Sequence, residues 1–215
     1  FKVKTHWCAL ISLIAAILIA VVGFKMPVTL SLLATGQGII FALIPIIYII
    51  IAAVWLYNLT EVSGRSKDLR AVFNTIGKGD IRVQALIVAF SFCGLLEGLA
   101  GFGAPVAIVA AMLVSLGLRP VKAAVVTIVG NAINVGYGAM AIPVTTAGRL
   151  GGQNPLLVAT DMGHLSWIIA CFVPLILLWI LDGGRGIAQL WPLALISGIA
   201  TAAGHFVTTG FSYEL

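Results

Sequence analysis

The sequence predicts an all-α polytopic membrane protein, and three observations carry that prediction. Of its 215 residues, 61% are hydrophobic and only 9% are charged, whereas an ordinary soluble domain has about 25% charged residues. Its longest apolar runs approach or exceed the roughly 17 to 25 residues that a helix needs to cross a bilayer. The basic residues lie in the connections between these runs, where they set topology or touch anionic headgroups. We therefore infer no nucleic-acid site from the net charge of +5.

The first predicted span covers residues 8–24 and ends at Lys25 and Pro27. Lysine prefers the membrane interface and proline discourages continuation of a helix. Residues 28–38 are semi-polar, and we expect them to form a connection or an interfacial turn.

The second predicted span covers residues 39–57, with Trp55 and Tyr57 at one end. Amphipathic rings favour the headgroup zone, so this end lies at the interface. Residues 58–84 form the one truly hydrophilic segment and hold five basic residues. The positive-inside rule makes this segment the predicted cytoplasmic loop.

The next apolar stretch, residues 85–116, is too long for one upright span. Its 32 residues would make a helix of about 48 Å against roughly 30 Å of hydrocarbon. Helix-disfavouring residues divide it at its midpoint into two apolar arms of about 12 residues. These residues are Gly94, Gly98, Gly101, Gly103 and Pro105. The pattern is typical of a re-entrant helical hairpin or a broken helix.

The basic residues favour the hairpin. If residues 85–116 enter and leave the membrane on the cytoplasmic side, 10 basic residues lie inside, and only Lys25 and Arg149 lie outside. If the stretch crosses the membrane, the division is 8 against 4. The positive-inside rule therefore favours a re-entrant hairpin.

The remaining apolar segments are a broken helix over residues 121–147 and plainer spans over 163–181 and 190–208, joined by residues 182–189. Two asparagines, one tyrosine, three glycines and a proline interrupt residues 130–144. Two neighbouring segments that are both broken at their middles resemble the discontinuous helices that surround transporter sites.

Glu97 is the main candidate for chemistry because it is the only acidic residue deep in an apolar stretch. A carboxylate at that depth costs at least about 2.5 kcal/mol. It either makes a structural hydrogen bond to backbone freed by the glycines, or it belongs to a substrate or proton-coupling site. In the second case Glu97 alternates between its neutral and charged forms.

The glycines and asparagines also allow two interpretations. Small residues allow close helix packing in lipid, and asparagines can join helices by hydrogen bonds. Alternatively, unwound backbone, a helix N-terminus and the Asn131 and Asn134 amides bind a carboxylate or hydroxyl. The expected substrate-binding residues are Gly98, Gly101, Phe102, Gly103, Asn131, Asn134, Tyr137 and Gly138.

Other polar residues are weaker candidates. We interpret His164, Trp167, His205 and Thr208–Thr209 as interfacial anchors or packing groups. Arg149 is either an exposed loop arginine or a group that steers anions. The three cysteines lie singly in apolar runs without metal-ligand spacing, and no nucleophile motif or deep aspartate pair is present. We therefore expect no enzyme activity, metal or cofactor.

The stretches FSFCGLLEGLAGFGAPVAIVAAMLVSLGLRP and GYGAMAIPV closely resemble bacterial lactate permeases, as do WLYNLTEVSGR and LDGGRGIAQLWPLAL. The resemblance covers nearly the whole chain. It implies a multi-pass transporter of the inner membrane that moves lactate or glycolate together with a proton. It also implies an ion-transporter type of fold, with inverted repeats that each hold a re-entrant hairpin followed by a broken helix.

Members of that family are much longer, so the resemblance implies an N-terminal fragment, one of two repeat-like halves. The expected partners are the remainder of the permease chain, the lipid bilayer, a small organic anion and further copies in a homo-oligomer. Family members commonly carry Asn-Thr-Ala-Pro-Val-Ala where this chain has GNAINVGYG. Alternatives to proton symport of a 2-hydroxy-monocarboxylate are a passive organic-anion channel, transport of another small carboxylate, and a half that is inactive alone.

Overall fold

The computed structural model describes residues 4–212, and within that range it is helical with no β-strand. Four helices among these residues are long and apolar enough to cross a membrane, or five if one bent pair counts as a single span. The predicted all-α membrane class is therefore confirmed. The chain divides into two compact units, residues 1–48 and 49–215, which are described separately.

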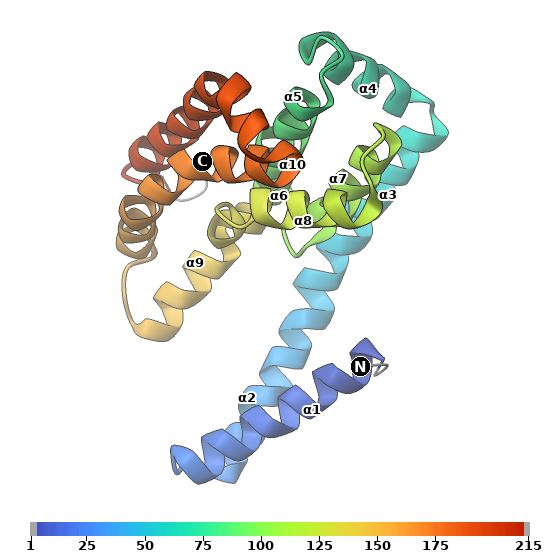
Figure 1. Ribbon diagram of the computed structural model, residues 1–215. Coiled ribbons are helices and arrows are strands. Elements are labelled where there is room, and N and C mark those ends of the chain that lie inside the picture. Colours follow the sequence, from blue (N-terminus) through green and yellow to red (C-terminus); the bar gives the residue numbers. More distant parts are fainter. Residues whose placement is uncertain (1–3, 213–215) are drawn as a thin grey trace. The chain divides into compact units, whose positions relative to one another are not determined.

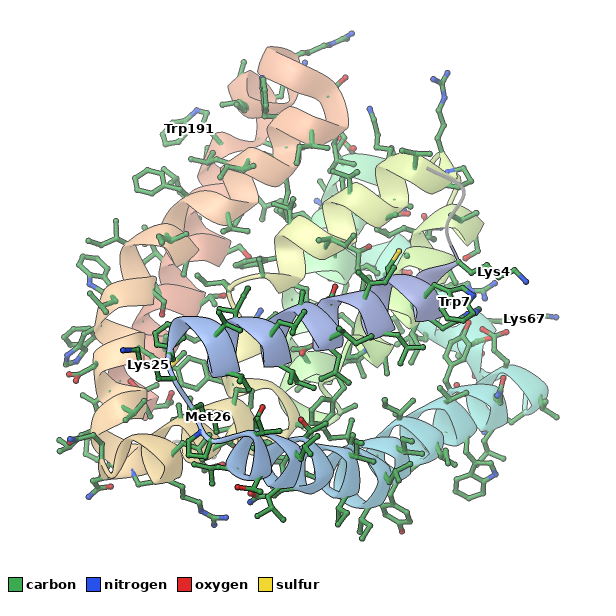
Figure 2. The ribbon with its side chains drawn as sticks, turned by 90° about the horizontal axis from the view of Figure 1, so that it is seen from below. Lys4, Trp7, Lys25, Met26, Lys67 and Trp191 are labelled. Atoms are coloured by element: carbon green, nitrogen blue, oxygen red, sulfur yellow. The ribbon has the colours of Figure 1, made fainter. Side chains whose placement is uncertain are left out.

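The first unit is a pair of apolar helices. Helix α1 (Thr5–Leu18) continues as the π-helix η1 (Ile19–Gly23), and α2 (Val28–Phe41) is followed by the π-helix η2 (Ala42–Ile46). Figure 2 shows Lys25 and Met26 at the turn between η1 and α2. The expected connection over residues 28–38 was wrong, because α2 begins there. Its hydroxyl groups fit within a helix: Thr35 donates a hydrogen bond to the Ser31 carbonyl.

Apolar side chains surround these helices on all sides. His6–Gly23 and Val28–Val62 each contain a strongly apolar stretch. In the structure that is described, no residue of either stretch is buried. A helix that is hydrophobic all round is either buried in protein or a membrane span. Lipid is therefore the expected surroundings of these side chains.

The hydrophilic segment after α3 (Ile47–Val62) contains a further helix, α4 (Arg65–Ile76). Arg70 on α4 forms an ion pair with Glu61 on α3, with 3.0 Å between Nη2 and Oε1. The buried Phe73 ring packs edge-on against Phe92, with 5.3 Å between the ring centroids. The predicted loop over residues 58–84 is therefore largely helical, and one aromatic contact docks it on the next segment.

A helical hairpin follows. Its first arm is α5 (Ile81–Leu86), the π-helix η3 (Ile87–Phe92) and α6 (Cys93–Leu99); its second arm is α7 (Ala104–Ser115). Positive φ angles at Gly101, Phe102 and Gly103 make the turn. The start of the first arm lies close to the end of the second, since a Cβ added to Gly117, just after α7, would lie 3.6 Å from Ile81 Cδ1. The first arm has 19 residues and is longer than the expected 12 or so, because it begins at Ile81.

The next segment is broken, as the sequence predicted. Helix α8 (Pro120–Asn131) is followed by the short 3-10 helix η4 (Val135–Tyr137) and by α9 (Gly138–Gly151). The two parts are bent by 66°. At the break Ala139, Met140 and Ala141 adopt left-handed φ angles of 48 to 60°, which non-glycine residues adopt rarely and which often mark functional sites.

The last element, α10 (Pro155–Thr208), is two helices joined at a sharp break. Asp182 and Gly183 have non-helical angles, and the second half runs back along the first (Figure 1). A Cβ on Gly198 would collide with the Cys171 backbone, and Thr160 donates a hydrogen bond to the Thr209 carbonyl. The two predicted spans therefore form an antiparallel pair, although the connection is shorter than residues 182–189.

The core of the second unit lies where the hairpin, α8 and α10 meet. It is built from large buried side chains, including Leu86, Phe90, Leu113, Leu177 and Leu178. A Cβ on Gly130 would collide with the Ala89 carbonyl, so α8 approaches η3 closely. Helices in lipid associate mainly by such close packing and by interhelical hydrogen bonds.

A polar cluster joins three chain segments at one end of the second unit. Arg82 donates hydrogen bonds to Asp80 (2.7 Å), Asp182 (2.9 Å) and Gln189 (2.8 Å). Lys122 Nζ donates to the Leu181 carbonyl at 2.8 Å. The hydrogen bond from Arg82 lowers the pKa of the Asp80 carboxyl below its usual value. The start of the hairpin, the start of α8 and the break in α10 therefore share this end.

The glycine contact within α10 leads to a stability prediction. Gly198→Ala should destabilise the protein by about 1 to 3 kcal/mol, because overpacking forces the two halves of α10 apart. Gly204→Ala on the same helix is the control, since a Cβ there meets nothing within 4 Å. Thermal unfolding in detergent should show a lower midpoint for Gly198→Ala alone. Equal midpoints for both variants would contradict the close antiparallel packing.

Candidate functional site

Glu97 is buried against Asn131 where the hairpin meets the break. Its side chain on α6 is only 2% exposed, and Asn131 is the last residue of α8. Asn131 Nδ2 donates a hydrogen bond to Glu97 Oε2 at 2.9 Å. Cys93, one turn before Glu97, donates from Sγ to Asn131 Oδ1 at 3.4 Å. The Asn131 amide therefore lies between a thiol and a carboxyl group.

The hairpin turn packs directly onto the start of α9. A Cβ on Gly101 would lie 2.6 Å from Ala139 N, and a Cβ on Gly138 would lie 2.7 Å from Glu97 Oε1. Gly101 also has a left-handed φ of 59°. Only glycine suits position 101, because a side chain there would meet the Ala139 backbone, whereas a side chain at position 138 would displace the Glu97 carboxyl group.

A first cavity of about 440 Å³ lies on the Glu97 side of α6. The hairpin turn, the end of α8 and the start of α9 line it. The lining residues used below are Glu97, Phe102, Gly103, Val106, Asn131 and Gly138. Helix α7 begins here; Ala104 N and Ala107 N donate to the Gly101 and Gly103 carbonyls of the hairpin turn, and Pro105 has no N–H group. The positive end of that helix dipole therefore faces the same space as the carboxyl group.

A second cavity of about 240 Å³ lies on the other side of α6. It is lined by Gly94 and Gly98 of α6, by Asn134 and Tyr137 at the break, and by the end of α10. The α10 residues are His205, Thr208 and Thr209. His205 Nε2 lies 3.3 Å from Asn134 Oδ1. Its ring packs edge-on against Tyr137, with 5.2 Å between centroids.

Charge is scarce around both cavities. Neither lining includes a lysine or arginine, and Glu97 is the only carboxylate in them, within the described part of the chain. Arg149 lies in the last turn of α9 and lines neither cavity. Any anion bound here would be held by backbone N–H groups, amides or His205.

The structure brings the sequence-predicted residues together but divides them between the cavities. Glu97, Phe102, Gly103, Asn131 and Gly138 line the first cavity. Gly98, Asn134 and Tyr137 line the second. Gly101 lines neither cavity; it lies in the hairpin turn and supports the packing described above.

Sequence reasoning missed Cys93 and His205. Cys93 was interpreted as a small apolar residue, and nothing in the sequence shows its contact with Asn131. His205 was interpreted as an anchor or packing group. An ionisable residue inside a membrane segment is itself a signal of a functional site, and this signal could have identified His205.

The sequence matches the L-lactate permease family over residues 1–215. It is 40% identical over 210 residues to the glycolate permease GlcA of Escherichia coli (strain K12), covering 98% of this chain and 37% of that protein. It is 37% identical over 210 residues to the L-lactate permease of Bacillus subtilis (strain 168), covering 98% of this chain and 37% of the relative. The chain thus spans less than half the length of these relatives. No solved structure matches it.

The docking of the hairpin turn predicts a difference between two glycines. Gly101→Ala should destabilise the protein by about 1 to 3 kcal/mol, because the methyl group meets Ala139 and the φ angle is unfavourable. Gly98→Ala adds the same group where nothing lies within 4 Å. Thermal unfolding of the purified variants measures the difference. A larger loss for Gly98→Ala would mean that the turn does not dock on α9.

Proposed function

Because the chain belongs to the L-lactate permease family, we propose that it is part of a transporter of lactate, glycolate or another small 2-hydroxy acid. In this proposal the transporter lies in the inner membrane and couples uptake to a proton. The names of the relatives support the substrate class, and the apolar helices support the membrane location. The observation that carries the coupling is the burial of Glu97 against Asn131 between two interrupted segments.

Glu97 is the proposed proton-binding group. Its charged form has one amide donor, and no lysine or arginine lines its cavity in the described chain. A lone charge in such surroundings is costly, and protonation removes that cost. Protonation also removes the repulsion between Glu97 and an incoming carboxylate. The proton and the anion would therefore load together, which is the requirement for symport.

We further propose that residues 85–116 form a re-entrant hairpin within one half of an inverted-repeat transporter. The polar cluster supports this topology, because Arg82, Lys122 and Asp182 lie at one end of the second unit. The relatives are long enough to hold a second half of similar size. The remainder of the chain would then complete the transport path.

The proton-coupling role predicts the behaviour of Glu97→Gln in the full-length protein. The variant should lose pH-driven accumulation of lactate and glycolate, because glutamine cannot bind the coupled proton. Exchange of internal for external substrate should persist, since the amide is neutral like a protonated carboxyl group. Uptake into proteoliposomes with and without a pH gradient measures both activities.

Asp68→Asn is the matched control, because it also removes one carboxylate but lies exposed on α4. It should leave accumulation unchanged. Undiminished uphill uptake by Glu97→Gln would exclude the coupling role. Wild-type flux that follows the membrane potential and ignores the pH gradient would instead indicate a passive anion channel.

The re-entrant topology predicts the sidedness of two positions. In a Cys8→Ala, Cys171→Ala background, Arg119→Cys should be labelled from the cytoplasmic side and Arg149→Cys from the opposite side. Of the three cysteines in these 215 residues, the one that remains, Cys93, is buried. A membrane-impermeant maleimide applied to right-side-out and inverted vesicles gives the readout. Arg65→Cys, in the hydrophilic segment, is the cytoplasmic control. Labelling of positions 119 and 149 from one side would exclude this topology.

A further inference from the structure

The second cavity has the chemistry of a neutral site for a polar anion. It lies across α6 from Glu97, and no carboxylate lines it within the described residues. Its volume of about 240 Å³ leaves room for a small hydroxy acid and several waters, since one liquid water occupies about 30 Å³. The side chains of Leu95, Leu99 and Met140 supply an apolar wall.

Most hydroxyl donors in this cavity are already used. Thr208 and Thr209 donate to the carbonyls of Gly204 and His205 in their own helix, and Tyr137 donates to the Ala159 carbonyl. Among the polar side chains that line the cavity, the Asn134 amide and the His205 ring keep hydrogen-bonding capacity for a ligand.

The contact between these two residues defines which ring nitrogen of His205 carries the proton. Asn134 Oδ1 can only accept a hydrogen bond, so His205 Nε2, 3.3 Å away, is the donor. In the neutral ring Nδ1 then holds a lone pair and can only accept. Nδ1 is buried and has no hydrogen-bond partner in the described structure. An unpaired buried acceptor is unfavourable, and a hydrogen bond from a ligand O–H would remove that cost.

The position of Asn134 is constrained as well. A Cβ on Gly94 would lie 2.7 Å from Asn134 Nδ2, so the amide nitrogen fits closely against α6. With Oδ1 directed to His205, the two N–H donors of the amide are available for a carboxylate. A donor for a carboxylate and an acceptor for a hydroxyl group therefore belong to two residues in contact, and a 2-hydroxy acid carries both polar groups on neighbouring carbons.

We propose that the second cavity is the substrate subsite, in which Asn134 binds the carboxylate and His205 Nδ1 accepts the hydrogen bond of the 2-hydroxyl group. This inference rests on the proposed transport of hydroxy acids. His205 is then the residue that distinguishes a 2-hydroxy acid from the plain acid of the same length. A site that hydrogen-bonds a substrate hydroxyl group disfavours the analogue that lacks it, because the buried acceptor stays unpaired.

The same turn joins this subsite to the proton site. Asn131 contacts Glu97 on one side of α6, Asn134 contacts His205 on the other, and Asn134 N donates to the Asn131 carbonyl at 2.9 Å. A ligand that moves Asn134 therefore acts on the backbone that positions Asn131. This arrangement gives the anion and the proton separate sites with a direct structural connection.

The test compares glycolate with acetate, which has the same carboxylate but no hydroxyl group. In proteoliposomes with the full-length protein, glycolate uptake and its inhibition by acetate are measured for wild type and His205→Phe. Phenylalanine keeps an aromatic ring against Tyr137 and removes both nitrogens. We expect the KM for glycolate to rise about tenfold while the inhibition constant of acetate stays unchanged.

His164→Phe is the matched control, because His164 packs against Phe206 and does not line the cavity. It should leave both constants unchanged. His205→Gln is a second variant whose side-chain oxygen keeps an acceptor, and it should retain part of the preference for glycolate. This graded result separates recognition of the hydroxyl group from a merely structural role of the ring.

Equal weakening of glycolate and acetate in His205→Phe, or no change in either, would overturn the inference. Loss of all uptake in both His205 variants, with normal amounts of inserted protein, would also overturn it. Wild-type protein that takes up neither glycolate nor lactate would refute the proposed function itself. Wild-type uptake with unchanged discrimination in His205→Phe would refute only the assignment of the subsite.

Discussion

The hydrogen bond from Asn131 to Glu97 is the interaction on which the centre of the second unit depends. It joins the last turn of α6 to the last residue of α8, two helices that both end inside the apolar part of the chain. A buried carboxyl group without such a partner would be costly. The geometry around it, with Gly138 packed on Glu97 and Cys93 bonded to Asn131, keeps the two helix ends together.

Glycine makes this meeting of helix ends possible. In lipid no hydrophobic effect drives helices together, so close van der Waals contact and hydrogen bonds must hold them. Gly101 against Ala139, Gly130 against Ala89 and Gly198 against Cys171 are contacts that a side chain would block. At other glycines, such as Gly98, an added Cβ would meet no neighbouring atom within 4 Å. Glycine content alone therefore does not identify packing positions in this chain.

The interrupted segments place polar groups on both faces of α6. Glu97 faces the cavity at the hairpin turn, whereas Gly94 and Gly98 face the cavity that contains Asn134 and His205. One short turn, from Asn131 to Asn134, contributes an amide to each side. Such an arrangement suits a protein that must relate the state of a buried acid to the occupancy of a nearby site. In the proposed function, transport is the setting for that relation.

The sequence by itself determined the membrane class, the hairpin and the broken helix, and it singled out Glu97 and Asn131, which the structure places in contact. These features can be read from single segments. The length of an apolar run, the helix-disfavouring residues within it and the energetic cost of a charge in lipid are all local properties of the sequence. Only the tertiary structure decided that residues 28–41 are helical, that Cys93 holds the Asn131 amide, and that the predicted residues line two cavities. It also brought His205 to Asn134 from 71 residues away. Such contacts depend on which faces of distant helices meet, and no single segment of the sequence encodes that choice.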